Sequence, residues 1–336
     1  MHDDLHPKEI SCVRADEQPN SALYSLLYLL ADGKTHQKKQ IKNHLKLTND
    51  TLSKLIQSIQ QLAIPCTNQL TSIQLKRPYE LISSSLIQQH NTFETSKLIE
   101  KFLIFPSLDS TNDYLMQSKT STLANICIAE MQTKGRGRQG NTWVSPFGEN
   151  IYLSISQLFK NKTYCFEALS LAIGLWVTAA LEKLNISGIQ LKWPNDIYLN
   201  NKKLAGILVE IEQKKANNWH VIIGIGLNIR LPETYKKTID QPVTDLHSNN
   251  KGVKISRNHL IAEILNNILP QLIQYDEFKP YYQQWNQYNH KNNQIIQIKM
   301  NQEIIEGINL GVNHKGLLQI ESNGRIHTIS NGVLAT

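Results

Sequence analysis

The chain has 336 residues, of which 40% are hydrophobic and 19% are charged, and its formal net charge is +7. This composition supplies enough apolar material for two or three domains, and it excludes a disordered chain, a collagen-like fibre and a small disulfide-stapled protein. The positive charge favours acidic partners such as nucleic acids, phosphates or nucleotides.

The cysteines and the hydropathy pattern indicate the compartment. Cys12, Cys66, Cys127 and Cys165 stand far apart with no CxxC pair, which is typical of a reducing environment and argues against a zinc module. No apolar run is long enough to cross a bilayer, and the residues Met1–Asp4 lack the pattern of a signal peptide. We therefore expect a cytoplasmic protein with no membrane partner.

The first eighty residues predict short helices. Leucines repeat at helical spacing from Leu23 to Leu30, residues 40–45 predict a second helix, and Thr48 or Asn49 can cap a third that extends to Leu62. This is the outline of a DNA-binding helix-turn-helix, although a small helical bundle with a solvated face fits the same pattern and is the commoner outcome. The polar residues that would contact DNA are Asn49, Thr51, Ser53 and Lys54.

Two weaker segments follow these helices. Residues 68–82 alternate weakly in hydropathy, which predicts a hairpin beside the helices. Residues 83–100 are rich in Ser, Gln and Thr, and they predict a linker or a boundary helix.

From residue 101 the pattern changes to closely spaced strands with a few longer helices. Pro270 should kink or split one of these helices. Strand hairpins in quick succession argue against a doubly wound parallel sheet and favour a mixed α/β domain. The predicted strands are 125–130, 151–156, 189–193, 196–199, 204–211 and 220–229, and the predicted helices are 168–184, 256–272 and 281–288.

The last forty-odd residues predict only strands and turns. Four strands are expected at 295–300, 303–312, 317–321 and 326–330, with glycines at the turns. A small β-barrel is the simplest fold for such a segment.

The segment Gly135-Arg136-Gly137-Arg138-Gln139-Gly140 follows a predicted buried strand. Its glycines let the backbone approach a ligand, and its arginines suit phosphate or carboxylate oxygens. It is neither a dinucleotide fingerprint nor a Walker loop, and a flexible basic loop explains it equally well on its own. Trp143 follows closely and could close over a bound ligand.

Three further clusters carry polar groups at strand ends. Lys192–Asp196 offers a lysine for phosphate, Lys203–Glu210 offers a lysine for a carboxylate beside small residues, and Gly224–Asn228 offers glycines that make a slot for a flat ligand. Each cluster taken singly is more often an ordinary turn or buried strand. The histidines show no metal-ligand spacing and no nucleophile motif is present, so the pattern indicates phosphate electrostatics and no protein-held metal site.

Together, in this order and spacing, the clusters resemble the family of bacterial bifunctional biotin–protein ligases and biotin-operon repressors. The resemblance covers nearly the whole chain and is strongest from Asp109 to Asn228. The motifs that carry it are Asp109–Asn112, Gln132 with Gly135–Arg138, Trp143–Gly148, Lys192–Asp196, Lys203–Glu210 and Gly224–Asn228.

The resemblance implies an α+β multidomain fold. An N-terminal winged helix-turn-helix is expected at 15–82, a central mixed α/β catalytic domain of the biotin/lipoyl-ligase type at 98–288, and a C-terminal SH3-like β-barrel at 290–336. It also implies a homodimer that forms through the central sheet when ligand binds.

The implied activity has two steps. Biotin reacts with Mg²⁺-ATP to give biotinoyl-5'-AMP, and a lysine of the biotin carboxyl carrier protein of acetyl-CoA carboxylase then receives the biotin. The same adenylate would act as corepressor when the protein binds operator DNA.

The resemblance also assigns residues to roles. The catalytic cations would be Arg136, Arg138, Lys192 and Lys203. Biotin would be bound by Ser110, Thr111, Asn112, Gln132, Arg136, Gly137, Arg138, Lys203, Gly206, Gly224 and Gly226. ATP would be bound by Arg136, Arg138, Trp143, Lys192, Asn195 and Asn228.

The chain departs from the family pattern at several points. Val243 stands where a tryptophan often stacks on adenine, Lys46 replaces the turn glycine of the helix-turn-helix, and Asp50 lies where it would repel phosphates. A glycine-rich wing is missing. A monofunctional ligase whose N-terminal domain does not bind DNA therefore remains an alternative, as does a related lipoate or octanoate ligase.

Overall fold

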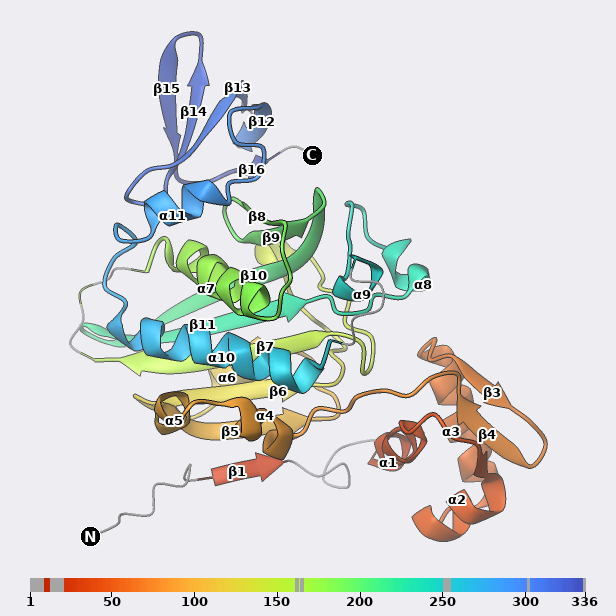
Figure 1. The fold of residues 1–336 in the computed structure, drawn as a ribbon. Coiled ribbons are helices and arrows are strands. Elements are labelled where there is room, and N and C mark those ends of the chain that lie inside the picture. The colour runs from red at the N-terminus through yellow and green to blue at the C-terminus, as the bar shows by residue number, and fades with distance from the viewer. Residues whose placement is uncertain are drawn as a thin grey trace, which may run out of the picture.

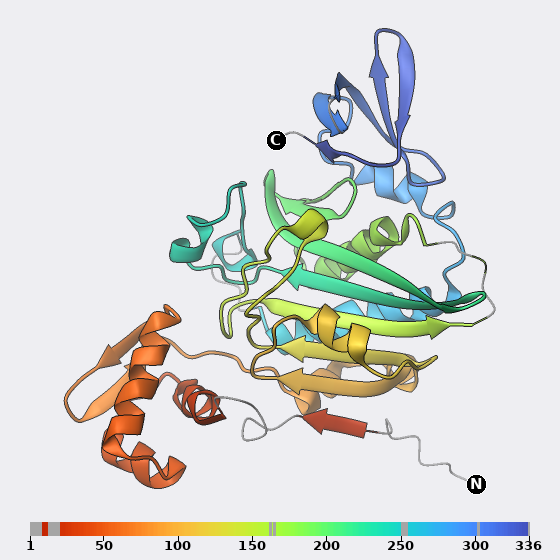
Figure 2. The ribbon, with the colours of Figure 1, turned by 180° about the vertical axis from the view of Figure 1, so that it is seen from behind.

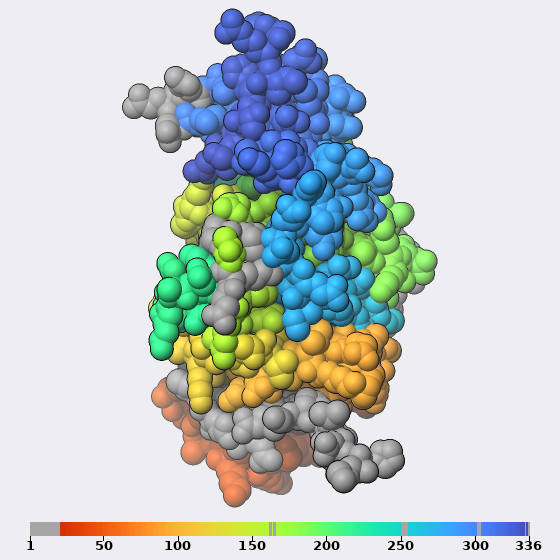
Figure 3. Space-filling view, turned by 90° about the vertical axis from the view of Figure 1, so that its left-hand side faces the viewer, coloured from red at the N-terminus to blue at the C-terminus, as the bar shows by residue number. Residues whose placement is uncertain are grey.

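The computed structural model describes residues 9–12, 21–160, 163, 166–249, 255–300 and 303–334. Over these ranges the chain forms an eight-stranded, a five-stranded and a three-stranded sheet (Figure 1). In the space-filling view, the C-terminal strands lie at one end, the N-terminal helices at the other, and the large sheet between them (Figure 3). The signal-peptide position Met1–Asp4, Cys165, and residues 15–20 and 335–336 of the predicted domains lie outside the described residues.

The N-terminal unit consists of three helices and a small antiparallel sheet. Leu26, Leu27, Ile41, Ile59 and Ile73 are fully or almost fully buried and form its own core. In α3 the buried residues Leu52, Ile56 and Ile59 recur at helical spacing, as expected for a helix with one face in this core. The elements are α1 (Ser21–Leu30), β2 (His36–Gln37), α2 (Lys38–Leu45), α3 (Asn49–Gln61), β3 (Cys66–Asn68) and β4 (Ser72–Leu75), with sheet order β2-β4-β3.

Two residues define the turn between α2 and α3. Thr48, rather than Asn49, caps α3, because its Oγ1 accepts a 3.1 Å hydrogen bond from the backbone N–H of Thr51. Lys46 ends α2 with a left-handed φ of 53°, the conformation that a glycine would adopt more easily. The turn therefore forms without glycine, at a cost of about 1 kcal/mol.

The central sheet has the order β1-β5-β6-β7-β11-β10-β9-β8. The β1–β5 and β5–β6 pairs are parallel and the other neighbours are antiparallel, so the predicted mixed sheet is confirmed. The sequence pattern missed β1 and most of β5. The strands are β1 (Glu9–Cys12), β5 (Ile99–Phe105), β6 (Ala124–Ala129), β7 (Ile151–Phe159), β8 (Ile189–Lys192), β9 (Asp196–Leu199), β10 (Lys202–Lys215) and β11 (Asn218–Leu227).

Helices cover both faces of this sheet. α7 (Leu169–Lys183) and α10 (Arg257–Gln274) lie on one face, and α6 (Thr111–Gln117) lies on the other (Figures 1 and 2). α7 is apolar around most of its surface because sheet, α10 and C-terminal segments enclose it. α10 runs through Pro270 as one helix, so the predicted split does not occur. The short helices α8 (Glu233–Lys236), α9 (Leu246–Asn249) and α11 (Tyr282–Gln287) complete this part.

The segment between the N-terminal unit and β5 is helical. α4 (Ser84–His90) and α5 (Phe93–Lys97) pack on α10, with Ile87 fully buried. The backbone N–H of Ser83 donates to Asn258 Oδ1 at 2.7 Å, and that of Thr92 donates to Asn266 Oδ1 at 3.0 Å. Residues 83–97 therefore belong to the central part by packing.

The C-terminal strands form an antiparallel sheet of order β15-β14-β13-β12-β16. Ile298, Leu318 and Ile320 are fully buried and join the core of the central part. The indole N–H of Trp193 donates to Gly316 O at 3.1 Å and ties the two parts together. The strands are β12 (Ile295–Met300), β13 (Glu303–Val312), β14 (Leu318–Ser322), β15 (Arg325–Ile329) and β16 (Val333–Leu334).

A buried ion pair links the end of β6, the start of α10 and the segment that follows the N-terminal unit. Glu130 is 0% exposed and lies 2.8 Å from Arg257, which is 3% exposed. Glu130 also accepts from the backbone N–H of Ile82, and Arg257 donates twice to Asn150 O. The carbonyl of Glu130 accepts from the N–H of Gly148, so both ends of the 131–147 loop are fixed at this pair.

Breaking this pair should strongly destabilise the fold. Arg257→Met leaves a fully buried carboxylate without its cation, and we expect the free energy of unfolding to fall by about 3–5 kcal/mol in urea denaturation. The double variant Glu130→Leu/Arg257→Met should recover part of this loss, because no charge is left unpaired. Asp50→Asn, which breaks the exposed Asp50–Lys54 pair, is the control and should cost less than about 1 kcal/mol.

Candidate active site

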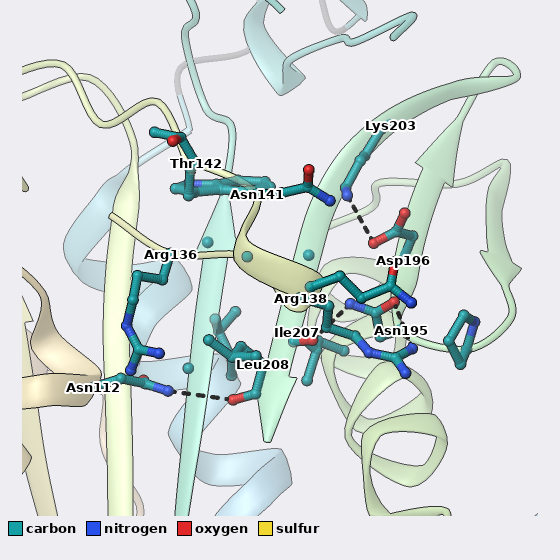
Figure 4. Close-up of a pocket in the computed structure, with 18 of the residues that line it drawn as sticks. Asn112, Arg136, Arg138, Asn141, Thr142, Asn195, Asp196, Lys203, Ile207 and Leu208 are labelled. Atoms are coloured by element: carbon teal, nitrogen blue, oxygen red, sulfur yellow. Dashed lines mark hydrogen bonds and ion pairs between the residues drawn. The ribbon is translucent and has the colours of Figure 1, made fainter. Parts of the chain in front are cut away.

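A cavity of about 370 Å³ lies on the α6 face of the central sheet. Its lining comes from the start of α6, the 131–147 loop, strands β8–β11 and the last strand β16, and Figure 4 shows part of it. The predicted site residues that line it are Ser110, Thr111, Asn112, Gln132, Arg136, Gly137, Arg138, Trp143, Lys192, Asn195, Lys203, Gly206, Gly224 and Gly226.

One end of the cavity is a connected set of neutral polar groups. The N–H and the hydroxyl of Thr111 donate to Gln132 Oε1 at 2.9 and 3.1 Å, and Gln132 Nε2 donates to Ser145 Oγ at 3.1 Å. Ser110 caps α6 by accepting from Asp113 N–H. Because each group is held by another, this end presents fixed donors and acceptors suited to an uncharged polar ligand head.

The floor next to it depends on the absence of a side chain at Gly224. A Cβ at this position would overlap the amide of Asn112. That amide accepts from Ser154 Oγ at 2.6 Å and donates to Glu210 Oε2 at 2.8 Å. Gly224 therefore lets Asn112 lie directly on β11.

Trp143 lies in a slot between two further glycines. A Cβ on Gly206 or Gly226 would press into its indole ring. The ring is also 5.6 Å from the ammonium of Lys203, a cation–π distance. Its N–H is buried without a hydrogen-bond partner among the described residues. The glycines thus form the flat slot that the sequence predicts, and Trp143 itself occupies it.

The other end of the cavity gathers cations. Lys203 forms a 2.8 Å ion pair with Asp196, and Lys192 donates to Tyr198 Oη at 3.3 Å. Arg138 points to Asn195, with 3.4 Å between Nη1 and Oδ1 (Figure 4). Both Lys192 and Arg138 are half-buried, and this burial lowers the pKa of each cation.

Arg136 has a different environment from Arg138. Its guanidinium lies beside Asn112 (Figure 4) and pairs with Asp113 and with Glu210, the latter at 2.8 Å. Burial alone would lower the pKa of Arg136, but the bonds to the two carboxylates outweigh it, so the pKa of Arg136 is raised. The structure therefore brings Arg138 to the cationic end, and it holds Arg136 beside the neutral polar end with its charge offset by two carboxylates.

Two predicted nucleotide contacts lie elsewhere. Asn228 does not line the cavity; it is 3% exposed and donates to Thr244 O at 3.1 Å. Val243 lies opposite Lys203 in a β-bridge whose hydrogen bonds join Lys203 to Pro242 and Thr244, and Gln241 lines the cavity instead. Asn228 thus holds the 244–246 segment on the end of β11.

Several lining or supporting residues were not predicted. Glu210 and Asp113 were ordinary charged residues in the pattern, and only their contact with Arg136 reveals their part. Gly332 and Leu334 line the cavity from the C-terminal sheet. No local signal could have placed these two, because their approach depends on how the sheets pack.

The cavity offers little for a protein-held metal ion. Of the described residues that line it, Asp196 alone carries a carboxylate, and it already pairs with Lys203. Among the described residues, no cluster of three His, Cys, Asp or Glu could hold a metal.

The predicted DNA-contacting residues lie in the first two turns of α3. Asn49, Ser53 and Lys54 are exposed, whereas Thr51 is half-buried and bonded to Thr48. Lys54 forms a 2.7 Å pair with Asp50, and both side chains are 74% exposed. A pair this exposed is weak and leaves Lys54 available to another anion.

Residues 104–228 match the biotin/lipoate A/B protein ligase family. The chain is 30% identical over 306 residues to the bifunctional ligase/repressor BirA of Salmonella typhimurium, covering 90% of this chain and 93% of the relative. The chain belongs to the biotin protein ligase family.

Other members support the same assignment. The biotin–[acetyl-CoA-carboxylase] ligase of Mycobacterium tuberculosis is 30% identical over 217 residues, which cover 62% of this chain and 77% of that protein. The structure of the Aquifex aeolicus biotin protein ligase in complex with biotin and ATP superposes with a TM-score of 0.59 at 27% identity, covering 70% of this chain and 97% of that one. In this ligase family member, no helix within the described ranges is long and apolar enough to cross a membrane.

Adding a methyl group to the slot should displace the tryptophan. In Gly226→Ala the new Cβ would overlap the Trp143 ring, so we expect a red-shifted tryptophan emission and faster tryptic cleavage in the 131–147 loop. Trp143→Phe identifies the Trp143 share of the emission from the chain's five tryptophans. An emission spectrum unchanged by Gly226→Ala would contradict this placement of the indole.

Proposed function

We propose that this protein is a biotin–protein ligase that activates biotin with ATP and transfers it to a lysine of the biotin carboxyl carrier protein of acetyl-CoA carboxylase. The observation that carries the proposal is the division of one cavity into a neutral polar end and a cationic end, with a glycine slot between them. Such a cavity fits a molecule with an uncharged polar head, a flat apolar body and a carboxylate that must meet a phosphate.

The cations explain how two anionic reactants can be brought together. Lys203 would leave Asp196 for the biotin carboxylate, while Lys192 and Arg138 would bind the phosphate oxygens on which charge develops. Partial burial strengthens these interactions because little water screens them. Mg²⁺ bound with the nucleotide would supply further neutralisation of the phosphates.

The neutral end and the loop explain selectivity and protection. Ser110, Thr111 and Gln132 would bond the polar head of biotin, and Gly206, Gly224 and Gly226 would flank its body. Trp143 would leave the slot and cover the adenylate, so that water is excluded until the acceptor lysine arrives. A lipoate or octanoate chain has no polar head to use the fixed groups around Thr111.

The N-terminal unit supports a second function, the binding of operator DNA. Residues 21–82 carry eight Lys or Arg against three Asp or Glu, and α3 exposes an uncharged polar side with Lys54. We interpret 15–82 as a winged helix-turn-helix with the β3–β4 hairpin as its wing, 98–288 as the catalytic domain and 290–336 as an SH3-like barrel. Biotinoyl-AMP would promote a homodimer that binds a two-fold operator.

One combined assay tests both functions. A gel shift on the biotin-operon promoter of the source organism, with and without biotin and ATP, is run beside transfer of biotin to a carrier fragment. Transfer with ligand-dependent, salt-sensitive retention supports both proposals. Transfer without retention removes the repressor proposal, and no transfer removes the ligase proposal.

Removing the carboxylate-binding lysine should stop the first step. In Lys203→Ala the biotin carboxylate would meet the unpaired Asp196, so we expect biotin-dependent pyrophosphate release to fall about 100-fold or more. The adjacent exposed Lys202→Ala is the matched control and should remain active. Near-normal pyrophosphate release by Lys203→Ala would refute its assigned role.

Charge changes on α3 should alter DNA binding in opposite directions. Lys54→Ala should weaken binding at all sequences and reduce the slope of log affinity against log salt by about 1, because one phosphate contact is lost. Asp50→Asn should strengthen binding, because a carboxylate next to the phosphates is removed. Equal retention of all three proteins across a salt series would argue that α3 does not face DNA.

A further inference from the structure

Two rows of side chains cross the hairpin strands β8, β9 and β10 on the cavity side. In one row Gln190, Tyr198 and Lys203 are directly opposite one another, and in the next row Lys192 is opposite Asp196. Residues opposite one another in antiparallel strands share a face of the sheet, so these side chains can interact diagonally. Both diagonals are used: Asp196 pairs with Lys203 at 2.8 Å, and Tyr198 bonds Lys192 at 3.3 Å.

Tyr198 therefore holds Lys192 in the same way that Asp196 holds Lys203. Its hydroxyl accepts from the Lys192 ammonium, and its ring lies 5.3 Å from the same ammonium nitrogen. The side chain is 3% exposed, and burial raises the pKa of its phenol, so it holds the cation without neutralising it. The phenol thus orients the Lys192 ammonium without adding a negative charge beside it.

The imidazole ring of His290 packs against the ring of Tyr198. The two rings are 4.7 Å apart between centroids, and Nδ1 of His290 lies 3.2 Å from Gln190 Oε1. The histidine is 6% exposed, and burial together with the charge of Lys192 and Lys291 lowers its pKa to about 4, so it is uncharged at neutral pH. The backbone N–H of His290 donates to Leu191 O at 2.9 Å, which fixes His290 against β8.

We propose that Tyr198, backed by His290, is a positioning residue that holds the Lys192 ammonium where the nucleotide phosphates bind. The inference rests on the proposed ligase function and assigns to Tyr198 and His290 an effect on nucleotide affinity but not on biotin affinity. Because His290 precedes β12, the base of the C-terminal sheet would take part in nucleotide binding through this stack.

The first test removes one oxygen. Tyr198→Phe keeps the aromatic ring against His290 and loses the hydroxyl acceptor, so the affinity of the biotin-loaded protein for α,β-methylene ATP should fall about tenfold in calorimetric titration. Biotin affinity and the melting temperature should stay unchanged. Tyr288→Phe is the matched control, since its hydroxyl bonds Glu182 away from the cavity.

The second test separates the ring contact between His290 and Tyr198 from the hydrogen bonding of the imidazole nitrogens. His290→Phe keeps an aromatic ring against Tyr198, whereas His290→Ala removes it. We expect nucleotide affinity to fall in His290→Ala and to be largely restored in His290→Phe. Equal loss in both variants would show that the ring stack does not transmit the effect.

The third test is the pH dependence of nucleotide binding. The charged groups that face Lys192 are Asp196, Lys203 and Lys291, and the uncharged ones are Tyr198 and His290. The bond to Tyr198 stabilises the ammonium, so its removal lowers the pKa of Lys192 further. The alkaline loss of nucleotide affinity should therefore begin at lower pH in Tyr198→Phe than in the unmodified protein.

The outcomes are distinct. Unchanged nucleotide affinity and pH profile in Tyr198→Phe would overturn the proposal, and so would a parallel loss of biotin affinity and stability, which indicates a merely structural role. If the protein transfers no biotin but its nucleotide binding depends on Tyr198, the proposed ligase function is wrong and the role assigned to Tyr198 is retained.

Discussion

The arrangement of the whole molecule depends on one ion pair that water does not reach. Glu130 and Arg257 join the end of β6, the start of α10 and the segment that leaves the N-terminal unit. The same pair fixes both roots of the 131–147 loop, because Gly148 bonds back to Glu130. A buried charge pair is a poor source of net stability, but a misaligned one is very costly, so it selects a single geometry. The position of the 131–147 loop over the cavity is therefore determined by the geometry of this ion pair.

Within the cavity, the chain holds its cations by weak or exchangeable internal partners. Lys203 rests on one carboxylate, Lys192 on a neutral phenol and Arg138 on an amide. Only Arg136 is bound by two carboxylates at once. A cation held by a weaker partner is already oriented and gives up little when an anion replaces that partner. This gradation separates the groups suited to substrate from the group that secures the loop.

The sequence allowed most of the cavity lining to be predicted, because motifs at strand ends meet where a sheet ends. It also indicated the mixed sheet, through the short intervals between hairpins. It did not reveal that Arg136 and Arg138, two residues apart, face different ends of the cavity, since that depends on a loop whose ends are fixed by distant residues. Nor could it predict that Asn228 bonds the carbonyl of Thr244 outside the cavity, or that β16 of another sheet lines the cavity, because neither contact leaves a local pattern in the sequence.

The tryptophan that fills the glycine slot also sets how any measured affinity must be understood. A ligand for that slot competes with a side chain tethered in the same molecule, so its apparent dissociation constant exceeds the intrinsic one by the inverse of the fraction of vacant slots. If the slot were vacant in about one molecule in a hundred, affinity would be reduced about a hundredfold. Every ligand that needs the slot bears this same cost, but a ligand that also engages the cations has further contacts to offset it. A fragment that fills only the slot has none, so the tryptophan excludes short ligands whose intrinsic affinity is already weak.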